Sequence, residues 1–388
     1  MTSFVKQIFK PALLILTMLC TSKVYAQISL FDNLINKIEN YKSLSYKSVN
    51  KRRDMSADTT IALNNEAFLK APNDKLFGYH YRLETNHTTE AFNRILLYDG
   101  KDQTILSLSD STFFPSHEGT GNFDQSLIGT LKFLRNRYNK KTFKVTQLRD
   151  TVINGVTNSH IIANVYDTIE NNEHLYSNRD YYLNKQTDLP SLVTIIGRYK
   201  YNGLVSGYYD ETRYSDYKMD NTDINDSLFL IPKGFTPRQD KAANALLAVG
   251  TSAPDWTLFD ANGKQTSLND LKGKVVMMDF YYIGCSGCMA SINPLKAIYE
   301  KYKNKGLVIA SLTARDSKKA VLDFEKRYKI SYSGYIGAAD VVRSYNVTAF
   351  PTFYFIDKAG KIANVFVGYT PDFENKLNTI ISKLLVAK

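Results

Sequence analysis

Apolar and polar residues alternate in runs across most of residues 27–238, a pattern typical of half-buried strands. Three clear runs cover 159–166, 192–201 and 205–219. Asn202 and Gly203 separate the last two runs and predict a hairpin turn. Residues 30–41 and 127–138 instead repeat apolar positions every three or four residues, as helices do. We therefore expect short antiparallel strands that form a curved sheet or an incomplete barrel, covered by helices.

The pattern changes beyond residues 239–253, an alanine-rich segment that predicts a linker between two domains. The run 273–282 is apolar around a single acid, Asp279, and predicts a buried strand. Further helices and strands are expected at 285–299, 307–312, 317–328, 352–357, 362–367 and 372–385. A βαβ unit followed by a hairpin and a helix is the order of a thioredoxin fold, which we predict for residues 254–388.

The chain has 388 residues, 44% of them hydrophobic and 22% charged, so it can form two or three cores. This composition argues against a disordered, collagen-like or coiled-coil protein. The 27 tyrosines and 21 phenylalanines favour strands, because aromatic side chains suit a pleated surface. The net charge is +11, but the basic residues are scattered without a dense cluster. We therefore expect a solvated basic face and no nucleic-acid partner.

Residues 1–26 have the pattern of a secretory signal peptide. Two lysines precede an apolar run at 13–20, and Ala26 provides a small residue at the expected cleavage site. The apolar run is too short to span a bilayer. A lipid anchor on Cys20 is disfavoured because Leu19 precedes it, where a small residue is usual. The prediction is export to the periplasm or cell envelope.

Only two cysteines follow the leader, Cys285 and Cys288, and their spacing indicates chemistry rather than a structural role. A disulfide across two intervening residues stabilises little, because the gain grows with loop length. Zinc needs about four ligands, and all five histidines lie in the other domain. Covalent haem would need a histidine where Met289 stands, and a Cys-His nucleophile lacks a nearby histidine. No metal or cofactor is therefore predicted.

Residues 250–388 resemble the extracytoplasmic thioredoxin-like disulfide reductases, a group related to cytochrome c maturation thioredoxins and redoxins. Three motifs carry the resemblance together: APDWTLFDANGKQTSLNDLKGKVVMMDFYY, GCSGC and FPTFYFIDKAGKI. The resemblance implies a thiol:disulfide oxidoreductase that reduces protein disulfides with electrons from a membrane thiol donor. Two residues depart from the family: Gly284 stands where tryptophan is common, and Pro294 lies one residue later than the helix-kinking proline of thioredoxins.

The two cysteines have different predicted roles. A helix that starts at Cys285 brings backbone N–H groups and the positive end of the helix dipole to its sulfur. These groups stabilise a thiolate, so Cys285 is the predicted attacking sulfur. Cys288, one turn further, would resolve the mixed disulfide. Asp279 matches the family's buried acid, whose raised pKa would let it take the proton of Cys288 through water. The alternative is an Asp279 that points to solvent at a strand edge.

Pro351 matches the family's cis-proline opposite the cysteine pair, although an ordinary trans proline is the alternative. Such a proline would let the backbone of the preceding residue pair with an extended substrate strand. The predicted substrate contacts are the neighbours of the sulfurs and of the proline: Gly284, Ser286, Gly287, Phe350 and Thr352. The Phe350 ring itself would form an apolar lip or pack in the core.

Two other functions stay open. A redoxin-type peroxidase is less favoured, because Tyr282 stands where a Pro-x-x-x-Thr-x-x-Cys pattern has threonine. Residues 180–190 and 224–235 resemble the periplasmic lipoprotein-carrier family, whose fold is an incomplete β-barrel around helices. That resemblance suggests an envelope binding module for an apolar ligand or protein, with an accessory redox domain. A large apolar cavity between residues 30 and 230 would support this alternative, and a filled barrel would favour dimerisation or docking.

Overall fold

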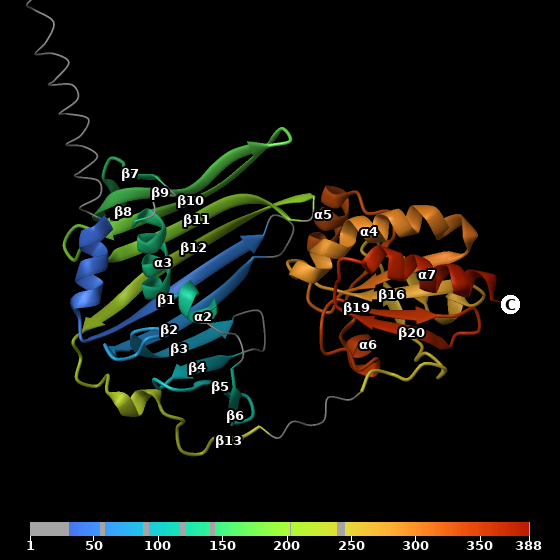
Figure 1. Cartoon of the computed structure of the whole chain (residues 1–388), viewed down its shortest axis with the longest axis horizontal. Coiled ribbons are helices and arrows are strands. Elements are labelled where there is room, and N and C mark those ends of the chain that lie inside the picture. The colour runs from blue at the N-terminus through green and yellow to red at the C-terminus, as the bar shows by residue number, and fades with distance from the viewer. Residues whose placement is uncertain are drawn as a thin grey trace, which may run out of the picture. The chain divides into compact units, whose positions relative to one another are not determined.

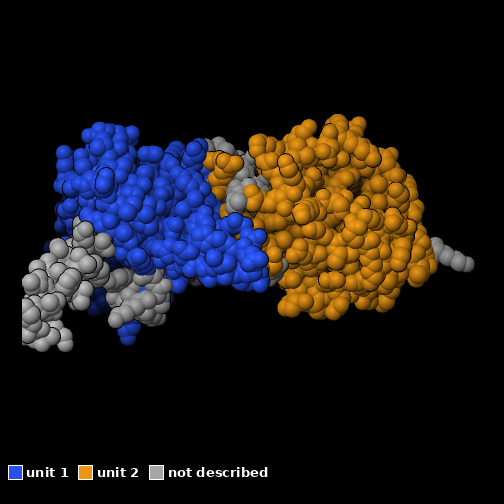
Figure 2. Space-filling view, turned by 90° about the horizontal axis from the view of Figure 1, so that it is seen from above, with its two compact units in different colours: residues 1–52, 60–198, 208–238 blue, residues 53–59, 199–207, 239–388 orange. Residues whose placement is uncertain are grey.

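The computed structural model describes these residues: 31–54, 59–87, 93–116, 121–139, 144–201, 203–238 and 245–387. The chain divides into two compact units, coloured separately in Figure 2. The N-terminal unit comprises residues 1–52, 60–198 and 208–238, and the C-terminal unit comprises 53–59, 199–207 and 239–388. The predicted leader and residues 239–244 of the predicted linker lie outside the described residues. The boundaries expected at residues 238 and 254 stay a prediction.

The N-terminal unit is built on one 13-stranded sheet with the order β13-β6-β5-β4-β3-β2-β1-β12-β11-β10-β9-β7, and β8 pairs with β9. Its first strands are β1 (Ser43–Asp54), β2 (Thr60–Lys70), β3 (Tyr79–His87), β4 (Arg94–Tyr98), β5 (Gln103–Ser107) and β6 (Thr112–Pro115). The others are β7 (Lys144–Gln147), β8 (Thr151–Ile153), β9 (Val156–Glu170), β10 (Glu173–Asn184), β11 (Pro190–Tyr201), β12 (Leu204–Met219) and β13 (Thr236–Pro237). β13 pairs with β6 in parallel, whereas the pairings β1–β2, β2–β3, β3–β4, β4–β5, β5–β6, β7–β9, β8–β9, β9–β10 and β10–β11 are antiparallel.

Helices lie against one face of this sheet (Figure 1): residues 31–40, α2 (Gly121–Gln125) and α3 (Leu127–Asn139). A short 3₁₀ turn, η1, covers Asp226–Phe229. The apolar positions that repeat along the first helix and α3 are buried in one core with the inward side chains of the strands. The mainly antiparallel domain with covering helices is therefore confirmed.

The run predicted at 205–219 nearly matches β12, but the run at 159–166 was too short, since β9 has 15 residues. The β9–β10 hairpin pairs out to Glu170 and Glu173, where the side chains are polar. Backbone hydrogen bonds hold such a hairpin tip without apolar side chains, so hydrophobic alternation marks only the half-buried part of each strand.

The C-terminal unit contains a five-stranded sheet with the order β18-β17-β16-β19-β20. The strands are β16 (Val275–Phe280), β17 (Leu307–Leu312), β18 (Ser333–Tyr335), β19 (Thr352–Ile356) and β20 (Ile362–Val367). The helices are α4 (Ser286–Tyr302), α5 (Lys318–Tyr328), α6 (Ala339–Ser344) and α7 (Phe373–Val386), with 3₁₀ turns η2 (Asn269–Leu271) and η3 (Lys303–Lys305). A separate hairpin joins β14 (Thr257–Phe259) to β15 (Gln265–Ser267). This is the predicted thioredoxin fold, with β18 and α6 as short additional elements.

Strand β16 lies at the centre of this sheet, parallel to β17 and antiparallel to β19. All six of its residues are buried, because both faces of the sheet are covered. Val276 and Met278 pack into one core, and Val275 and Met277 pack into another with side chains of α4 and α7. Asp279 continues the second set and therefore faces the side of the sheet that α4 covers.

Across the described ranges, the search for helices with the length and apolar character of a membrane span finds none.

Candidate active site

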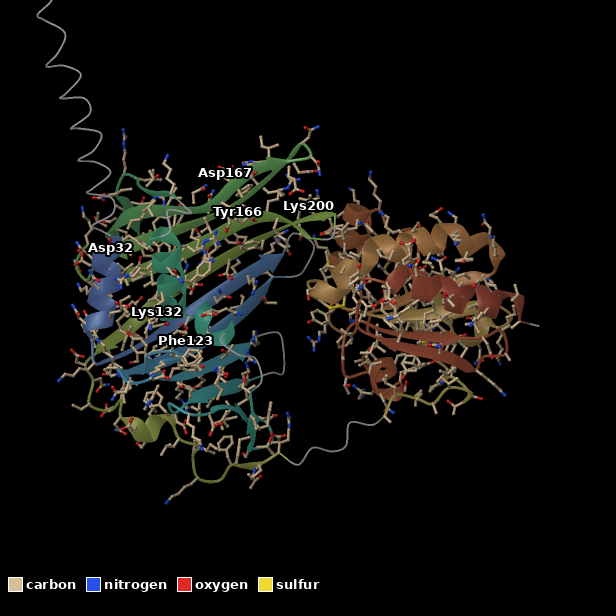
Figure 3. All side chains as sticks on the ribbon, viewed as in Figure 1. Asp32, Phe123, Lys132, Tyr166, Asp167 and Lys200 are labelled. Carbon is tan, nitrogen blue, oxygen red and sulfur yellow. A yellow bond between two sulfur atoms is a disulfide. The ribbon has the colours of Figure 1, made fainter. Side chains whose placement is uncertain are left out.

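The cysteine pair lies where the chain leaves β16 and enters α4. Cys285 is the N-cap residue of α4, and its Sγ accepts a hydrogen bond from the backbone N–H of Cys288 at 3.2 Å. The two sulfurs form a disulfide, drawn in yellow in Figure 3, with the Cα atoms 5.2 Å apart. A helix N-terminus carries free N–H groups and a partial positive charge, so this position stabilises negative charge on Cys285 when the pair is reduced.

Both cysteines are largely buried, but the outer part of the turn is open. Cys285 is 7% exposed and Cys288 4% exposed, whereas Gly284 and Ser286 are exposed. Gly284 has a φ of +93°, which glycine adopts without strain. Asp316 fixes the short segment between β16 and Cys285. Its Oδ2 accepts hydrogen bonds from the Ile283 N–H at 3.1 Å and from the Thr313 hydroxyl at 2.6 Å. Gly284 and Ser286 are thus the exposed residues next to the sulfurs.

Pro351 lies directly against the first turn of α4, and the Phe350–Pro351 peptide bond is cis. A Cβ atom added to Gly287 would lie 2.9 Å from Pro351 Cδ, closer than side-chain atoms tolerate. The Pro351 carbonyl accepts a hydrogen bond from the Gly368 N–H at 2.8 Å, which fixes this loop to the end of β20. The fold thus brings together Cys285, Cys288, Gly287 and Pro351.

Phe350 and Thr352, on either side of the proline, have different surroundings. Phe350 is half-buried, and its ring packs edge-on against Tyr282 with 5.4 Å between centroids. The exposed Arg315 guanidinium lies 4.8 Å from the Tyr282 ring centre, a cation–π contact that the sequence analysis missed. Thr352 is 1% exposed, and its hydroxyl donates to the Ala349 carbonyl at 2.7 Å. Its backbone lies in β19 between Phe280 of β16 and Val367 of β20.

Asp279 is a buried carboxyl group rather than a solvent-facing one, with 4% of its surface exposed. The Ser311 hydroxyl donates a hydrogen bond to its Oδ2 at 2.9 Å, and Oδ1 has no hydrogen-bond partner among the described residues. Burial raises the pKa of Asp279 to about 7, because the charged form loses its hydration, and the Ser311 hydrogen bond partly opposes this rise. Such a group can exchange a proton near neutral pH.

A small cavity connects this acid with the second cysteine. Its volume is about 10 Å³, and its walls include Asp279, Cys288, Ser311, Tyr332 and Glu325. This space is comparable to what roughly one water molecule requires, and the walls offer polar partners. Sequence analysis missed Glu325, because a carboxyl group on an amphipathic helix is normally solvated. Its pKa is raised by burial, while its Oε1 accepts a hydrogen bond from the Gly334 N–H at 2.9 Å.

Among the residues that the structure describes, no cluster of three or more histidine, cysteine or acidic side chains is arranged to hold a metal ion. Three of the described histidines, His80, His160 and His174, each lie beside an aspartate of the N-terminal unit.

A cysteine pair at the start of a helix, packed against a proline loop in this fold, defines a thioredoxin-like thiol:disulfide oxidoreductase. The redoxin family matches residues 248–381. The chain is 32% identical over 141 residues to the thiol-disulfide oxidoreductase ResA of Bacillus cereus, and this match covers 36% of the chain and 79% of ResA. It is 31% identical over 128 residues to ResA of Bacillus subtilis, and this match covers 33% of the chain and 72% of that ResA.

Among solved structures, the thioredoxin domain of a thiol-disulfide oxidoreductase from Bacteroides vulgatus is 31% identical. The match covers 35% of this chain and 99% of that domain, with a TM-score of 0.32. The sequence matches to the ResA proteins decide the assignment. The chain belongs to the redoxin family of thiol-disulfide oxidoreductases.

Proposed function

We propose that this protein is exported and reduces disulfide bonds in other proteins through Cys285 and Cys288. The observation that carries the proposal is the position of the two sulfurs at the start of α4, beside Pro351. The leader pattern at residues 1–26 supports export to the periplasm or cell envelope. Protein disulfides are the substrates, and a membrane thiol donor supplies the electrons.

In the first step, the thiolate of Cys285 attacks one sulfur of the substrate disulfide. The substrate S–S bond breaks, one substrate sulfur leaves as a thiolate, and a mixed disulfide forms with Cys285. The loop at Gly284, Ser286 and Gly287 and the backbone at Phe350 are where an extended substrate would lie. The exposed Ser286 and the half-buried Phe350 ring support this placement.

In the second step, Cys288 loses its proton and attacks Cys285 Sγ, so the mixed disulfide breaks and the second substrate thiol is released. Two electrons have then passed to the substrate, and the enzyme holds the Cys285–Cys288 disulfide. Asp279 accepts the Cys288 proton through a water molecule in the shared cavity. The buried carboxyl group and the cavity wall that it shares with Cys288 support this role.

The test traps the mixed disulfide. Cys288→Ala is expressed in the native envelope, and proteins that stay disulfide-linked to Cys285 are identified, with the double variant Cys285→Ala/Cys288→Ala as a control. We expect capture by the single variant alone, and reduction of insulin by the purified wild type. The proposal fails if the single variant captures nothing beyond the control and the wild type leaves insulin oxidised.

A second candidate function concerns the N-terminal unit. The structure contains a cavity of about 980 Å³ between its sheet and the helices α2 and α3. A space of this size is large enough for a small molecule and supports a binding role. Both functions can belong to one chain, because each uses its own unit.

A further inference from the structure

The large cavity of the N-terminal unit is lined by polar as well as apolar side chains, so it differs from the apolar cavity that would indicate a purely apolar ligand. Its walls contain the side chains of three arginines, Arg52, Arg94 and Arg179, together with His87 and several hydroxyl and amide groups. Phe77, Leu83, Leu96, Phe123 and Leu127 also line it. The class of ligand therefore depends on how these two kinds of side chain are distributed.

Strand register arranges the inward side chains in rows across the sheet. Four rows follow from the pairings of β1, β2, β3 and β4: Tyr46, Glu66, Leu83 and Leu96; Ser48, Asn64, Thr85 and Arg94; Asn50, Ala62 and His87; Arg52 and Thr60. The row through Leu83 and Leu96 lies toward the aromatic core, and the row with Arg52 lies at the ends of β1 and β2. Polarity therefore increases along the strands from one end of the cavity to the other.

Glu66 lies in the row with Leu83 and Leu96, and it carries less negative charge than a free carboxylate would. It is buried and accepts a hydrogen bond from the Tyr46 hydroxyl at 2.6 Å. Burial raises the pKa of Glu66 to about 7, so much of it is protonated near neutral pH. Lys132, labelled in Figure 3 beside Phe123, donates to the Phe77 carbonyl at 2.6 Å and is thereby tied to the fold.

The polar end carries more positive than negative groups. Asp210 accepts a hydrogen bond from the Asn50 amide at 2.6 Å and interacts electrostatically with Arg52 and Arg179. Burial raises the pKa of Asp210 in spite of these two arginines. Within the described ranges, the buried Nε of Arg179 and Nδ1 of His87 make no hydrogen bond. At this end Asp210 thus faces Arg52 and Arg179, while the other aspartate of the cavity wall, Asp124 on α2, is exposed. The buried Arg179 Nε and His87 Nδ1 have unused hydrogen-bonding capacity.

A purely apolar ligand would leave the buried Arg179 Nε and His87 Nδ1 without hydrogen-bond partners, which costs free energy. An acidic head group would instead form charge-assisted hydrogen bonds with the guanidinium groups. We propose that this cavity binds an anionic amphiphile, with its acidic group at the Arg52, Arg94 and Arg179 end and its apolar part beside Phe77 and Leu96. The inference rests on the binding role proposed above and names the class of ligand.

The test uses two fluorescent probes with the same chain and different head groups: 11-(dansylamino)undecanoic acid, which is charged, and its methyl ester, which is neutral. Fluorescence titrations of the full-length protein should show the acid binding about 10-fold or more tightly than the ester. Arg179→Met keeps the apolar stem of the side chain but removes its charge, and it should reduce that ratio several-fold. The matched control is Arg213→Ala on β12, because Arg213 alternates with the cavity residues Thr212 and Tyr214 and pairs with Glu211 on the other face.

Three outcomes would overturn the inference. Equal binding of acid and ester would retain the binding role but show that the ligand need only be apolar. No binding of either probe would remove both the ligand class and the binding role. Arg52→Met serves as a second charge-removing variant. An unchanged acid-to-ester ratio in both Arg179→Met and Arg52→Met would also contradict the proposal. Circular dichroism of both variants tests whether a weaker affinity is caused by unfolding.

Discussion

Ser311 donates a hydrogen bond to Asp279 from the neighbouring strand, with 2.9 Å between Ser311 Oγ and Asp279 Oδ2. The bond stabilises the charged carboxylate, so it holds the pKa of Asp279 lower than burial alone would. Hydrogen bonds to charged groups are worth about 1.5 kcal/mol or more, and one pKa unit corresponds to about 1.4 kcal/mol.

Ser311→Ala should therefore raise the pKa of Asp279 by about one unit. In the wild type, the rate of the resolving step should rise with pH around neutrality. In Ser311→Ala the same rise should occur about one pH unit higher. Stopped-flow measurement of substrate release across pH 5 to 9 gives both midpoints. Ser291→Ala is the matched control, because Ser291 lines the same cavity but donates to the Cys288 carbonyl. Equal midpoints in wild type and Ser311→Ala would contradict the assignment.

Asp279→Asn should slow the resolving step by about 100-fold, because general bases typically contribute 10²-fold or more. The attack of Cys285 should stay nearly unchanged, since the N-terminus of α4 stabilises its thiolate. Rapid mixing of reduced protein with a disulfide substrate separates mixed-disulfide formation from its decay. Alkylation of Cys285 by iodoacetamide provides the control for the first step. If the mixed disulfide decays equally fast in both proteins, Asp279 has no part in the reaction.

The buried Asp279 should also make stability depend on pH. Its pKa is about 7 in the folded protein and 3.8 ordinarily, so between these values the folded state binds more protons than the unfolded state. The free energy of unfolding should therefore fall as pH rises from about 4 to about 7, by on the order of 3 kcal/mol. The asparagine in Asp279→Asn does not titrate, so the free energy of unfolding of this variant should not show this decrease.

Trp256 is the single tryptophan of the chain and is buried in the C-terminal unit, so its fluorescence reports unfolding there. Urea titrations of the oxidised protein at several pH values test the prediction. Glu66→Gln is a suitable control, because it removes a buried carboxyl group with a similar pKa from the other unit. If the stability of the wild type does not fall between pH 4 and 7 relative to that of Asp279→Asn, the result contradicts a buried Asp279 with a raised pKa.

Gly287→Ala should damage the active site, because its new Cβ would meet Pro351 Cδ at 2.9 Å. The proline ring and α4 would have to separate, and overpacking of this kind costs about 1–3 kcal/mol. We expect lower stability and slower insulin reduction, measured on the same preparation. Ser382→Ala at an exposed position of α7, outside the active site, should change neither by much. Wild-type activity and stability in Gly287→Ala would exclude the tight contact.

Local patterns in the sequence were sufficient for most elements of the C-terminal unit. The strands at 307–312 and 362–367 were predicted with the bounds that the structure has, because both follow clear turns. The elements β18 and α6 were missed, since three and six residues are too few for a hydrophobic period to be recognised. In the N-terminal unit the pattern predicted antiparallel strands and nearly the full length of β12, but it underestimated the length of β9.

The sequence by itself determined the chemistry of the site, because Cys285 and Cys288 are neighbours on one helical turn and need no distant residue to be recognised. Tertiary structure decided which other groups join them. Ser311 lies 32 residues from Asp279, and Arg315 and Glu325 reach the site only through the loop and helix that follow β17. Likewise, the register of β1 to β4 decided that arginines share a cavity with leucines. Contacts between distant residues depend on packing and strand pairing, which neighbouring residues along the chain do not specify.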